Sequence, residues 1–362
     1  MKKFIIKTSF FVLPFIFFYF MNEKFSQQGE GDLARLGDLY FNPSPYSQVV
    51  SQFDKLPQKY KKVSELNLNQ THKVDVLTIG DSFSEGNQYK GYLVHKGLSL
   101  LHVDRFLSEE NPMQNLVAFA NSDFFDYIKP QYVVLQNVER YVIKRNAELD
   151  FSAEKDIESV KNRISENLIK EERKKTSKRK VSFFSDATIR KPLNNLQFLF
   201  FVKPLDSDIY RYRSNNNQLF TNNPKELLFY KEDIDFLSDK NDIEKIQNLN
   251  ASFNEISRLL AKKGIKLIIL IAPDKYDLYY PYIKNKDKKQ PVFFNFFDKL
   301  DKEFLYVPSY VILSDEIKKN KKDIYFYDDT HWSPNGALSI SEEIYRIIKN
   351  NTTNQQKSNG GF

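Results

Sequence analysis

The chain has 362 residues, with 54 basic and 47 acidic side chains, a formal net charge of +7 and no cysteine. Because 41% of the residues are hydrophobic and 28% are charged, the chain can bury a sizeable core and is not wholly disordered. The lack of cysteine excludes a disulfide scaffold, a cysteine zinc site, a thiol nucleophile and iron–sulfur ligation. The basic balance leaves nucleic acid, anionic lipid and acidic polysaccharide open as partners.

The first 22 residues have the pattern of an export signal or a signal-anchor. Three lysines among the first seven residues precede an apolar stretch at residues 10–21. The residues that follow offer no convincing small-residue cleavage site. We therefore predict an uncleaved membrane anchor at 1–22, with the rest of the chain on the periplasmic or extracellular side and a polar tether at 23–70. A cleaved signal is the alternative.

Hydrophobic patterns then predict an α/β core with parallel strands. Buried strands are expected at residues 74–79, 132–135 and 266–271, and a short one at 323–327. Helices are expected at residues 91–101, 113–128, 254–263 and 333–348. Strand, helix, strand at this spacing predicts a parallel sheet flanked by helices.

The remaining segments break this rhythm. Residues of about 146–255 are predicted to be a mainly helical insertion into a domain at 71–350, with a solvated basic run at 170–180. The polar residues 351–362 are predicted to be a disordered tail.

A first chemical motif, GDSFS at residues 80–84, stands where a predicted strand ends. The hydroxyl of Ser82 would lie at the carboxyl edge of a parallel sheet, where α/β folds bind ligands. Its own backbone N–H, close to a helix N-terminus, could help to stabilise an oxyanion. Taken alone, the motif more often marks a plain turn.

A second motif, DDTHWSPNG at residues 328–336, places His331 just ahead of the last predicted helix. Asp328 and Asp329 precede it by three and two residues. A serine nucleophile needs a neutral imidazole as base, and the imidazole needs a carboxylate to fix its tautomer. Taken alone, His331 is more often a structural histidine, and the neighbouring Trp332 could simply pack in the core.

Together, GDSFS and DTHWSPNGA resemble the SGNH hydrolase superfamily and, more narrowly, the periplasmic alginate and polysaccharide O-acetyltransferase group. The resemblance covers about 72–145 and 256–350. It implies an SGNH-like, flavodoxin-like α/β fold, with Ser82 as nucleophile and His331 as general base. The narrower Asp-Thr-His-Trp pattern selects Asp329 as the acid, which we favour, whereas the broader Asp-x-x-His pattern selects Asp328.

The glycine and asparagine that usually complete the oxyanion hole of this superfamily have no clear counterpart here. The candidates for oxyanion or substrate contacts are Gly86, Asn121, Asn137, Arg140, Lys275, Tyr279 and Trp332. Structural alternatives stand beside them. Arg140 could pair with Glu139, and Lys275 and Tyr279 could be ordinary loop residues.

The resemblance implies an exported O-acetyltransferase that modifies a cell-surface or secreted polysaccharide through a serine acyl-enzyme. Its partners would be the polysaccharide acceptor, the membrane and an acetyl donor delivered by a multi-spanning acyltransferase. We predict no cofactor, no metal and no nucleic-acid partner. Two alternatives stay open: an SGNH carbohydrate esterase or deacetylase, in which water resolves the intermediate, and a non-catalytic glycan-binding assembly protein.

Overall fold

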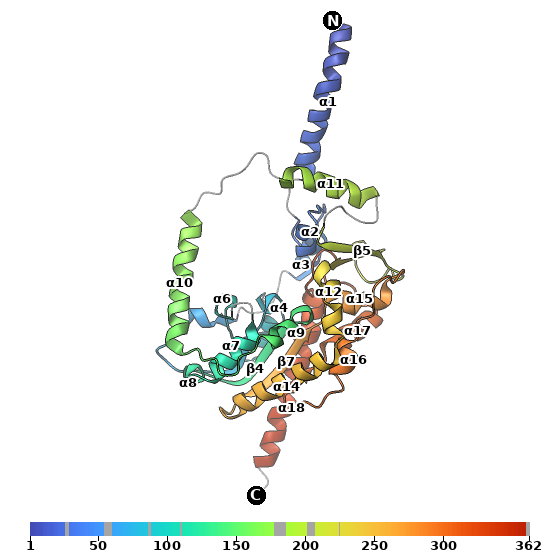
Figure 1. Cartoon of the computed structure of the whole chain (residues 1–362). Coiled ribbons are helices and arrows are strands. Elements are labelled where there is room, and N and C mark those ends of the chain that lie inside the picture. The colour runs from blue at the N-terminus through green and yellow to red at the C-terminus, as the bar shows by residue number, and fades with distance from the viewer. Residues whose placement is uncertain are drawn as a thin grey trace.

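The computed structural model describes residues 1–25, 29–53, 60–85, 88–108, 111–176, 186–200, 207–223 and 225–359. Its central feature is a sheet of six strands in the order β1-β3-β2-β4-β7-β8, in which every neighbouring pair is parallel (Figure 1). The strands are β1 (Lys61–Lys62), β2 (His72–Ile79), β3 (Leu100–His102), β4 (Ile128–Val138), β7 (Lys266–Ala272) and β8 (Leu305–Val307). The predicted strands at 74–79, 132–135 and 266–271 are confirmed as parts of β2, β4 and β7.

Helices cover both faces of this sheet because its strands are apolar on both sides. In β7, Ile268 and Leu270 face one core, whereas Leu267, Ile269 and Ile271 face the other. The helices of the first core are α5 (Gln88–His95), α17 (Ser309–Lys318) and α18 (Pro334–Asn359), and those of the second are α7 (Pro112–Ala120), α9 (Glu139–Ala147), α14 (Ile243–Ala261) and α16 (Phe293–Phe297). The sequence prediction of a parallel α/β sheet flanked by helices is confirmed.

Short helices mostly occupy the turns between these elements. They are α4 (Ser82–Glu85), α6 (Arg105–Ser108), α8 (Phe124–Tyr127), α15 (Lys275–Tyr279) and the 3₁₀ helices η1 (Ser51–Phe53), η2 (Val63–Glu65) and η3 (Tyr280–Tyr282). The helix predicted at 91–101 is wrong at its end. α5 stops at His95, Gly97 adopts a φ of 87°, and β3 follows.

The strand predicted at 323–327 is wrong. Only Tyr325 forms an isolated bridge, with Trp332. The carbonyls of Phe326 and Tyr327 instead accept hydrogen bonds from the buried Lys275 ammonium, at 2.7 and 2.6 Å. The segment is therefore a loop that the Lys275 ammonium holds by hydrogen bonds, and it is not a strand of the sheet.

The predicted insertion is less helical and shorter than expected. Its elements are α10 (Ile157–Thr176), α11 (Asp186–Phe200), the antiparallel pair β5 (Ile209–Arg213) and β6 (Glu226–Tyr230), and the short helices α12 (Lys231–Asp235) and α13 (Leu237–Lys240). α14 was predicted only at 254–263, but it is the crossover helix between β4 and β7 and belongs to the main layer. Of the basic run at 170–180, residues 177–180 lie outside the described residues.

The N-terminal region also departs from the prediction. α1 (Lys2–Phe25) is followed by α2 (Asp32–Leu36) and α3 (Pro45–Val50). Leu33 and Ala34 are fully buried and Leu39, Val49 and Val63 are at most 2% exposed, so these described parts of the predicted tether at 23–70 pack into the domain. Within the described parts of the chain, no helix is both long and apolar enough to cross a membrane. At the other end, α18 continues past the predicted helix end into the predicted tail.

Candidate active site

Ser82 opens α4 immediately after β2, at the carboxyl edge of the sheet. A side chain on Gly80 would come within 2.6 Å of the Ser84 hydroxyl and the Gln136 carboxamide, so this tight turn requires glycine. Asp81 holds the turn from within, because its Oδ1 accepts the Phe83 N–H at 3.2 Å. The local sequence therefore folds into a strand–turn–helix that presents Ser82 at the end of a core strand.

A buried network fixes this turn to the neighbouring strand β4. Asp81 Oδ2 accepts from the Val138 N–H at 2.8 Å and from Arg145 Nη1 at 2.7 Å. Arg145 Nη1 also donates to Asn137 Oδ1 at 3.0 Å. Burial opposes ionisation of Asp81, but Arg145 outweighs it and lowers the pKa of that carboxyl. Asp81 and Arg145, which the sequence pattern did not single out, anchor the turn that presents Ser82.

The structure brings the two sequence motifs together. His331 Nε2 lies 2.8 Å from Ser82 Oγ, and His331 Nδ1 lies 2.6 Å from Asp329 Oδ1. Asp329 Oδ1 also accepts the backbone N–H of His331 at 2.9 Å, which ties the carboxylate to its own loop. A hydroxyl, an imidazole and a carboxylate are thus joined in series, the arrangement that lets a histidine take a proton from a serine.

The charges of Asp329 and His331 shift each other's pKa values in opposite directions. The Asp329 side chain is 8% exposed, and although burial opposes its charge, His331 holds the pKa of Asp329 well below its usual range. Burial likewise opposes a charged imidazole, but the Asp329 carboxylate outweighs it and raises the pKa of His331 above its usual value. The histidine is therefore a stronger base than a free imidazole.

A second carboxylate, which the sequence analysis missed, lies beside the imidazole. Asp32 Oδ2 is 3.4 Å from His331 Nδ1. The same carboxylate accepts the Thr330 N–H at 2.7 Å and the Thr330 hydroxyl at 2.6 Å, while the Asp32 N–H donates to Asp329 Oδ2 at 2.9 Å. Hydrogen bonds of Asp32 thus attach α2 to the loop that carries Asp329 and His331.

This attachment depends on a close approach between the backbones of Gly31 and Asp328. A side chain on Gly31 would come within 2.1 Å of the Asp328 carbonyl oxygen, so only glycine fits there. The Ala34 N–H donates to that same carbonyl at 3.1 Å. The local signal for this contact is a Gly-Asp pair followed by Leu33 and Ala34, which is too common to interpret in a sequence alone.

Asp328 has a different environment from Asp329. Its Oδ2 is 3.5 Å from the Ser44 hydroxyl, and its buried Oδ1 has no hydrogen-bond partner among the described residues. Burial raises the pKa of Asp328 to about 6. Of the two predicted acids, Asp329 contacts His331 and Asp328 does not.

The two candidate asparagines lie at opposite ends of the parallel strands. Asn137 lies two residues after Leu135, which pairs with Ile79, and Arg145 connects its Oδ1 to Asp81, the residue before Ser82. Its buried Nδ2 has no hydrogen-bond partner among the described residues. Asn121 follows α7, which leads through α8 into the amino end of β4, and it donates to the Phe151 and Ala153 carbonyls. Asn121 is therefore a structural residue far from the Ser82 turn.

The other candidates are mostly buried in structural roles. Lys275 is fully buried and donates to the carbonyls of the 326–329 loop, including Asp329 at 3.1 Å. Tyr279 accepts the Tyr325 N–H, and Trp332 packs edge-to-face on Phe83. These side chains build the loop and are not available to a substrate. Gly86 lies outside the described residues.

Arg140 also differs from its expected pairing. It donates to Asp233 Oδ1 at 2.6 Å and Asp274 Oδ1 at 3.0 Å, not to Glu139. Glu139 instead faces the fully buried Lys240, at 3.4 Å. The ligand atoms of Glu139, Asp274 and Asp277 lie close enough together for a metal ion. Lys240 Nζ already bonds Asp274 at 2.5 Å and Asp277 at 3.2 Å, so an ammonium holds that position.

The carboxylates around His331 are likewise engaged. Asp32, Asp329 and His331 also have ligand atoms within 4.8 Å of one another. Their oxygens accept N–H and O–H donors from the loop and from α2. The donor set fits a proton-transfer site better than a metal centre.

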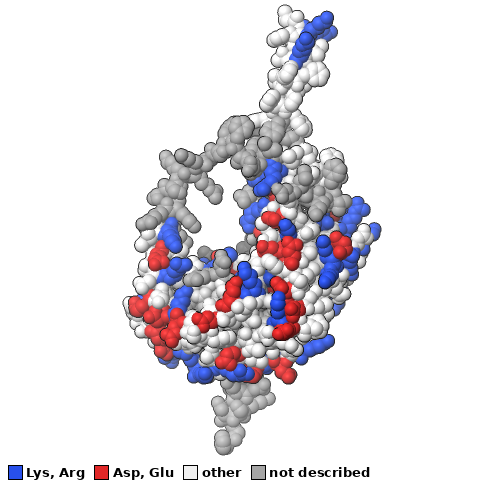
Figure 2. Space-filling model, in the orientation of Figure 1, with Lys and Arg blue, Asp and Glu red and all other residues white. Residues whose placement is uncertain are grey.

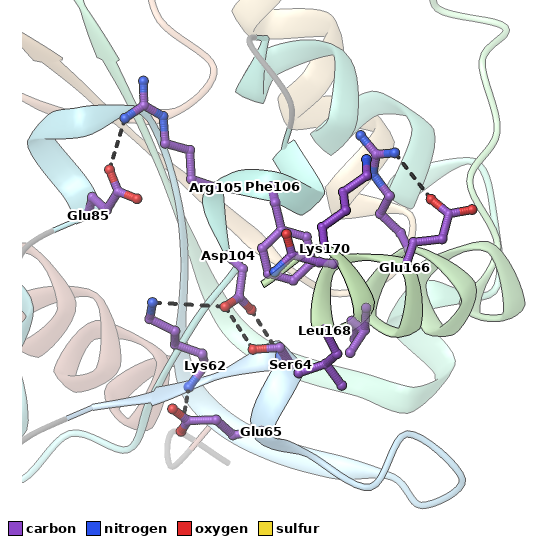
Figure 3. Close-up of a pocket in the computed structure, with 13 residues that line it drawn as sticks. Lys62, Ser64, Glu65, Glu85, Asp104, Arg105, Phe106, Glu166, Leu168 and Lys170 are labelled. Atoms are coloured by element: carbon purple, nitrogen blue, oxygen red, sulfur yellow. Dashed lines mark hydrogen bonds and ion pairs between the residues drawn. The ribbon is translucent and has the colours of Figure 1, made fainter. Parts of the chain in front are cut away.

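A groove of about 960 Å³ opens beside α4 (Figure 3). Glu85, at the end of α4, forms one wall with Arg105, to which it is paired at 2.9 Å. α10 forms the opposite wall, where Leu168 is exposed and Glu166 is paired with Arg163. Four basic and four acidic side chains line the groove, together with Phe106, Ile164 and Leu168. The groove therefore places charged side chains of both signs beside α4, and one of them, Glu85, lies three residues after Ser82.

One comparison with known proteins finds a match. Residues 225–361 match the family model of the SGNH hydrolase-like domain of acetyltransferase AlgX. This confirms the resemblance seen in the sequence for the part of the chain that carries Asp329 and His331, whereas Ser82 lies outside the matched residues. The SGNH hydrolase-like domain supports a polysaccharide acetyltransferase-type protein with acyltransferase or esterase activity. No curated protein and no solved structure matches the chain.

Proposed function

We propose that the protein is an exported, membrane-anchored O-acetyltransferase that transfers acetyl groups to a cell-surface or secreted polysaccharide. The observation that carries this proposal is the series Ser82 Oγ, His331 and Asp329, joined at 2.8 and 2.6 Å. The match of the carboxyl-terminal residues to an acetyltransferase domain supports the reaction class.

In the first half-reaction Ser82 Oγ attacks the acetyl carbonyl of the donor while His331 Nε2 takes the hydroxyl proton. Asp329 stabilises the resulting imidazolium. As the carbonyl re-forms, the bond to the donor's leaving group breaks, and His331 gives that group its proton. The Ser82 N–H and Asn137 Nδ2 are the proposed donors to the oxyanion.

In the second half-reaction a sugar hydroxyl gives its proton to His331 Nε2 and attacks the acetyl ester on Ser82. The tetrahedral intermediate collapses, the acetyl group leaves on the sugar oxygen, and the proton returns to Ser82 Oγ. The groove beside α4 is the proposed path of the polysaccharide. We further propose that a multi-spanning membrane acyltransferase supplies the acetyl donor.

Labelling with an activated-phosphonate serine probe tests the nucleophile. We expect an adduct at Ser82 that is lost in Ser82→Ala and kept in Ser84→Ala, because the Ser84 hydroxyl bonds Tyr89 and Gln136 instead of His331. The lack of an adduct in the folded wild-type protein would favour the non-catalytic glycan-binding alternative.

Labelled acetyl distinguishes transfer from hydrolysis. With an acetyl donor and an oligosaccharide acceptor, we expect the label on the sugar. Label released only as free acetate would identify an esterase with the same acyl-enzyme, because the two reactions differ in whether a hydroxyl or water reaches the ester.

A further inference from the structure

The helix α11 packs with its polar side toward the protein. Asn194 and Asn195 are buried, and their amides donate to the carbonyls of Gly37 at 3.0 Å and Asp38 at 2.9 Å. The Tyr40 N–H donates to Asn195 Oδ1 at 2.9 Å. The same inward side carries Phe198, which is partly buried against the core and packs edge-to-face on Phe41. Polar and apolar contacts therefore both hold α11 to the domain.

The opposite side of α11 is apolar and exposed. Leu193 is 47%, Leu199 66% and Phe200 76% exposed. Leu193, Leu196 and Phe200 follow the spacing i, i+3, i+7, which places them on one helix face, and Leu199 borders this face because it lies three residues after Leu196. Leu193, Leu199 and Phe200 are therefore exposed, while the two asparagines and Phe198 hold the helix to the domain.

α11 adjoins the N-terminal helix α1 and lies across its lower end (Figure 1). The consecutive residues Phe10, Phe11, Val12 and Leu13 are 76%, 76%, 44% and 59% exposed. Four consecutive residues, 100° apart, cover every direction around a helix. Figure 2 shows the basic groups of α1 gathered at its free end and an uncharged surface below them.

At residues 10–13 the surface of α1 is apolar in every direction, which fits a surrounding apolar medium better than a protein groove, because a groove covers only one side of a helix. The exposed face of α11 continues this surface. The lysines at the start of α1 favour anionic headgroups. An amphipathic helix with outward leucines and phenylalanine fits the lipid–water interface.

We propose that α11 is an interfacial helix that lies on a lipid bilayer with Leu193, Leu199 and Phe200 in the headgroup–acyl boundary. The segment that holds α11, residues 37–40, continues directly from α2, whose Asp32 bonds Asp329. The lipid contact therefore positions the Ser82 site close to the membrane surface. The use of this arrangement for receiving a membrane-delivered acetyl group rests on the proposed function, but the lipid contact itself does not.

The cysteine-free chain allows a direct test. The full-length Leu199→Cys protein is labelled with an environment-sensitive fluorophore and mixed with vesicles of phosphatidylethanolamine and phosphatidylglycerol. Ile243→Cys is the matched control, since Ile243 is 46% exposed at the start of α14, away from α1. We expect a blue-shifted emission at position 199 that lipid-attached nitroxide quenches, and no change at position 243.

Two results would overturn the inference. One is that the protein does not co-float with the vesicles in a density gradient. The other is a vesicle-bound protein in which the label at position 199 has the same emission wavelength as in buffer without vesicles, because α1 alone would then make the lipid contact. Neither readout needs catalysis, so the inference can fail while Ser82 still reacts with the phosphonate, and the reverse.

Discussion

Two carboxylates from distant parts of the chain lie beside the imidazole of His331, and their geometry separates their roles. Asp329 is 2.6 Å from Nδ1 and is also bonded to the backbone of its own loop. The Asp32 carboxylate is 3.4 Å from the same nitrogen and accepts hydrogen bonds from the N–H and the hydroxyl of Thr330. Asp329 is therefore the direct partner of the imidazole, and Asp32 is a positioning residue that also adds negative charge.

Exchanging each aspartate of the second motif for asparagine separates the two candidate acids. We expect Asp329→Asn to lower kcat for a soluble acetyl ester on the order of 10³- to 10⁴-fold, because an amide favours the wrong histidine tautomer. Asp328→Asn should change kcat only by about a few-fold, since Asp328 does not contact His331. Equal, mild losses in both variants would contradict the assignment.

The pH dependence of kcat/KM tests Asp32. His331 acts as a base only when neutral, and both Asp329 and Asp32 raise its pKa, so activity should rise with pH through a value above the usual 6.5. Asp32→Asn removes one of these charges but keeps a hydrogen-bond acceptor for Thr330. We expect the acidic limb to move to lower pH by up to about one unit.

Asp38→Asn is the control for that experiment. Asp38 lies in the same segment but pairs with Arg190 rather than with the His331 loop. Its substitution should leave the acidic limb in place. A profile that moves equally in both variants would mean that the segment acts through folding alone.

At the scale of elements, buried charges join α9, α13 and α15. Lys240 from α13 is fully buried and contacts Asp274, Asp277 and Glu139 at 2.5, 3.2 and 3.4 Å. These contacts fix the loops that follow β4 and β7, next to the strand end that carries Asn137. The cluster therefore supports the rim of the site without contacting Ser82.

Removing the buried cation should unfold the protein more easily. Lys240→Met leaves several carboxyl groups buried without their cation, and we expect a loss of about 3–5 kcal/mol in the free energy of unfolding. Lys245→Met is the matched control, because Lys245 is 46% exposed and pairs with the exposed Asp239. Its loss should be within about 1 kcal/mol. Urea denaturation measures both, and similar losses would contradict the prediction.

For the whole molecule, this cluster makes stability depend on pH. It contains four carboxyl groups, Glu139, Asp233, Asp274 and Asp277, against two cations, Arg140 and Lys240. Burial raises the pKa of Asp233 to about 7 and that of Asp277 to about 6. The folded protein therefore keeps protons here that the unfolded chain would lose near its ordinary pKa of 3.8.

Since these folded-state pKa values are raised, their stabilising effect is present at low pH and is lost as the pH rises through them. We expect the free energy of unfolding to fall between about pH 4 and 7 by roughly 1.4 kcal/mol per pH unit for each proton that only the folded protein still holds. Asp233→Asn should make this fall shallower, because the amide does not titrate. Denaturation midpoints that rise over the same pH range would contradict the assignment.

The sequence predicted the parts of the protein that are encoded by local pattern. The strands β2, β4 and β7 are apolar runs between turn residues, and α/β sheets bury such runs on both faces. Ser82 and His331 were found because strand-end and loop–helix motifs are short and recognisable. The pair β5 and β6 was missed because β5 (IYRYR) lies in a polar and aromatic stretch, and the apolar part of β6 (LLF) is too short to distinguish a strand from a helix.

What the tertiary structure decided are contacts between residues far apart in the chain. Asp32 reaches Asp329 across 297 positions, and no spacing rule connects a loop near the N-terminus with one near the C-terminus. The burial of Lys275, Tyr279 and Trp332 could not be predicted either, because a residue after a core strand can face solvent or fold back under a loop. The sequence by itself determined the sheet and the chemical groups. The tertiary structure decided which carboxylates contact the histidine and which side of α11 packs on the domain. Both outcomes depend on packing and desolvation over the whole molecule.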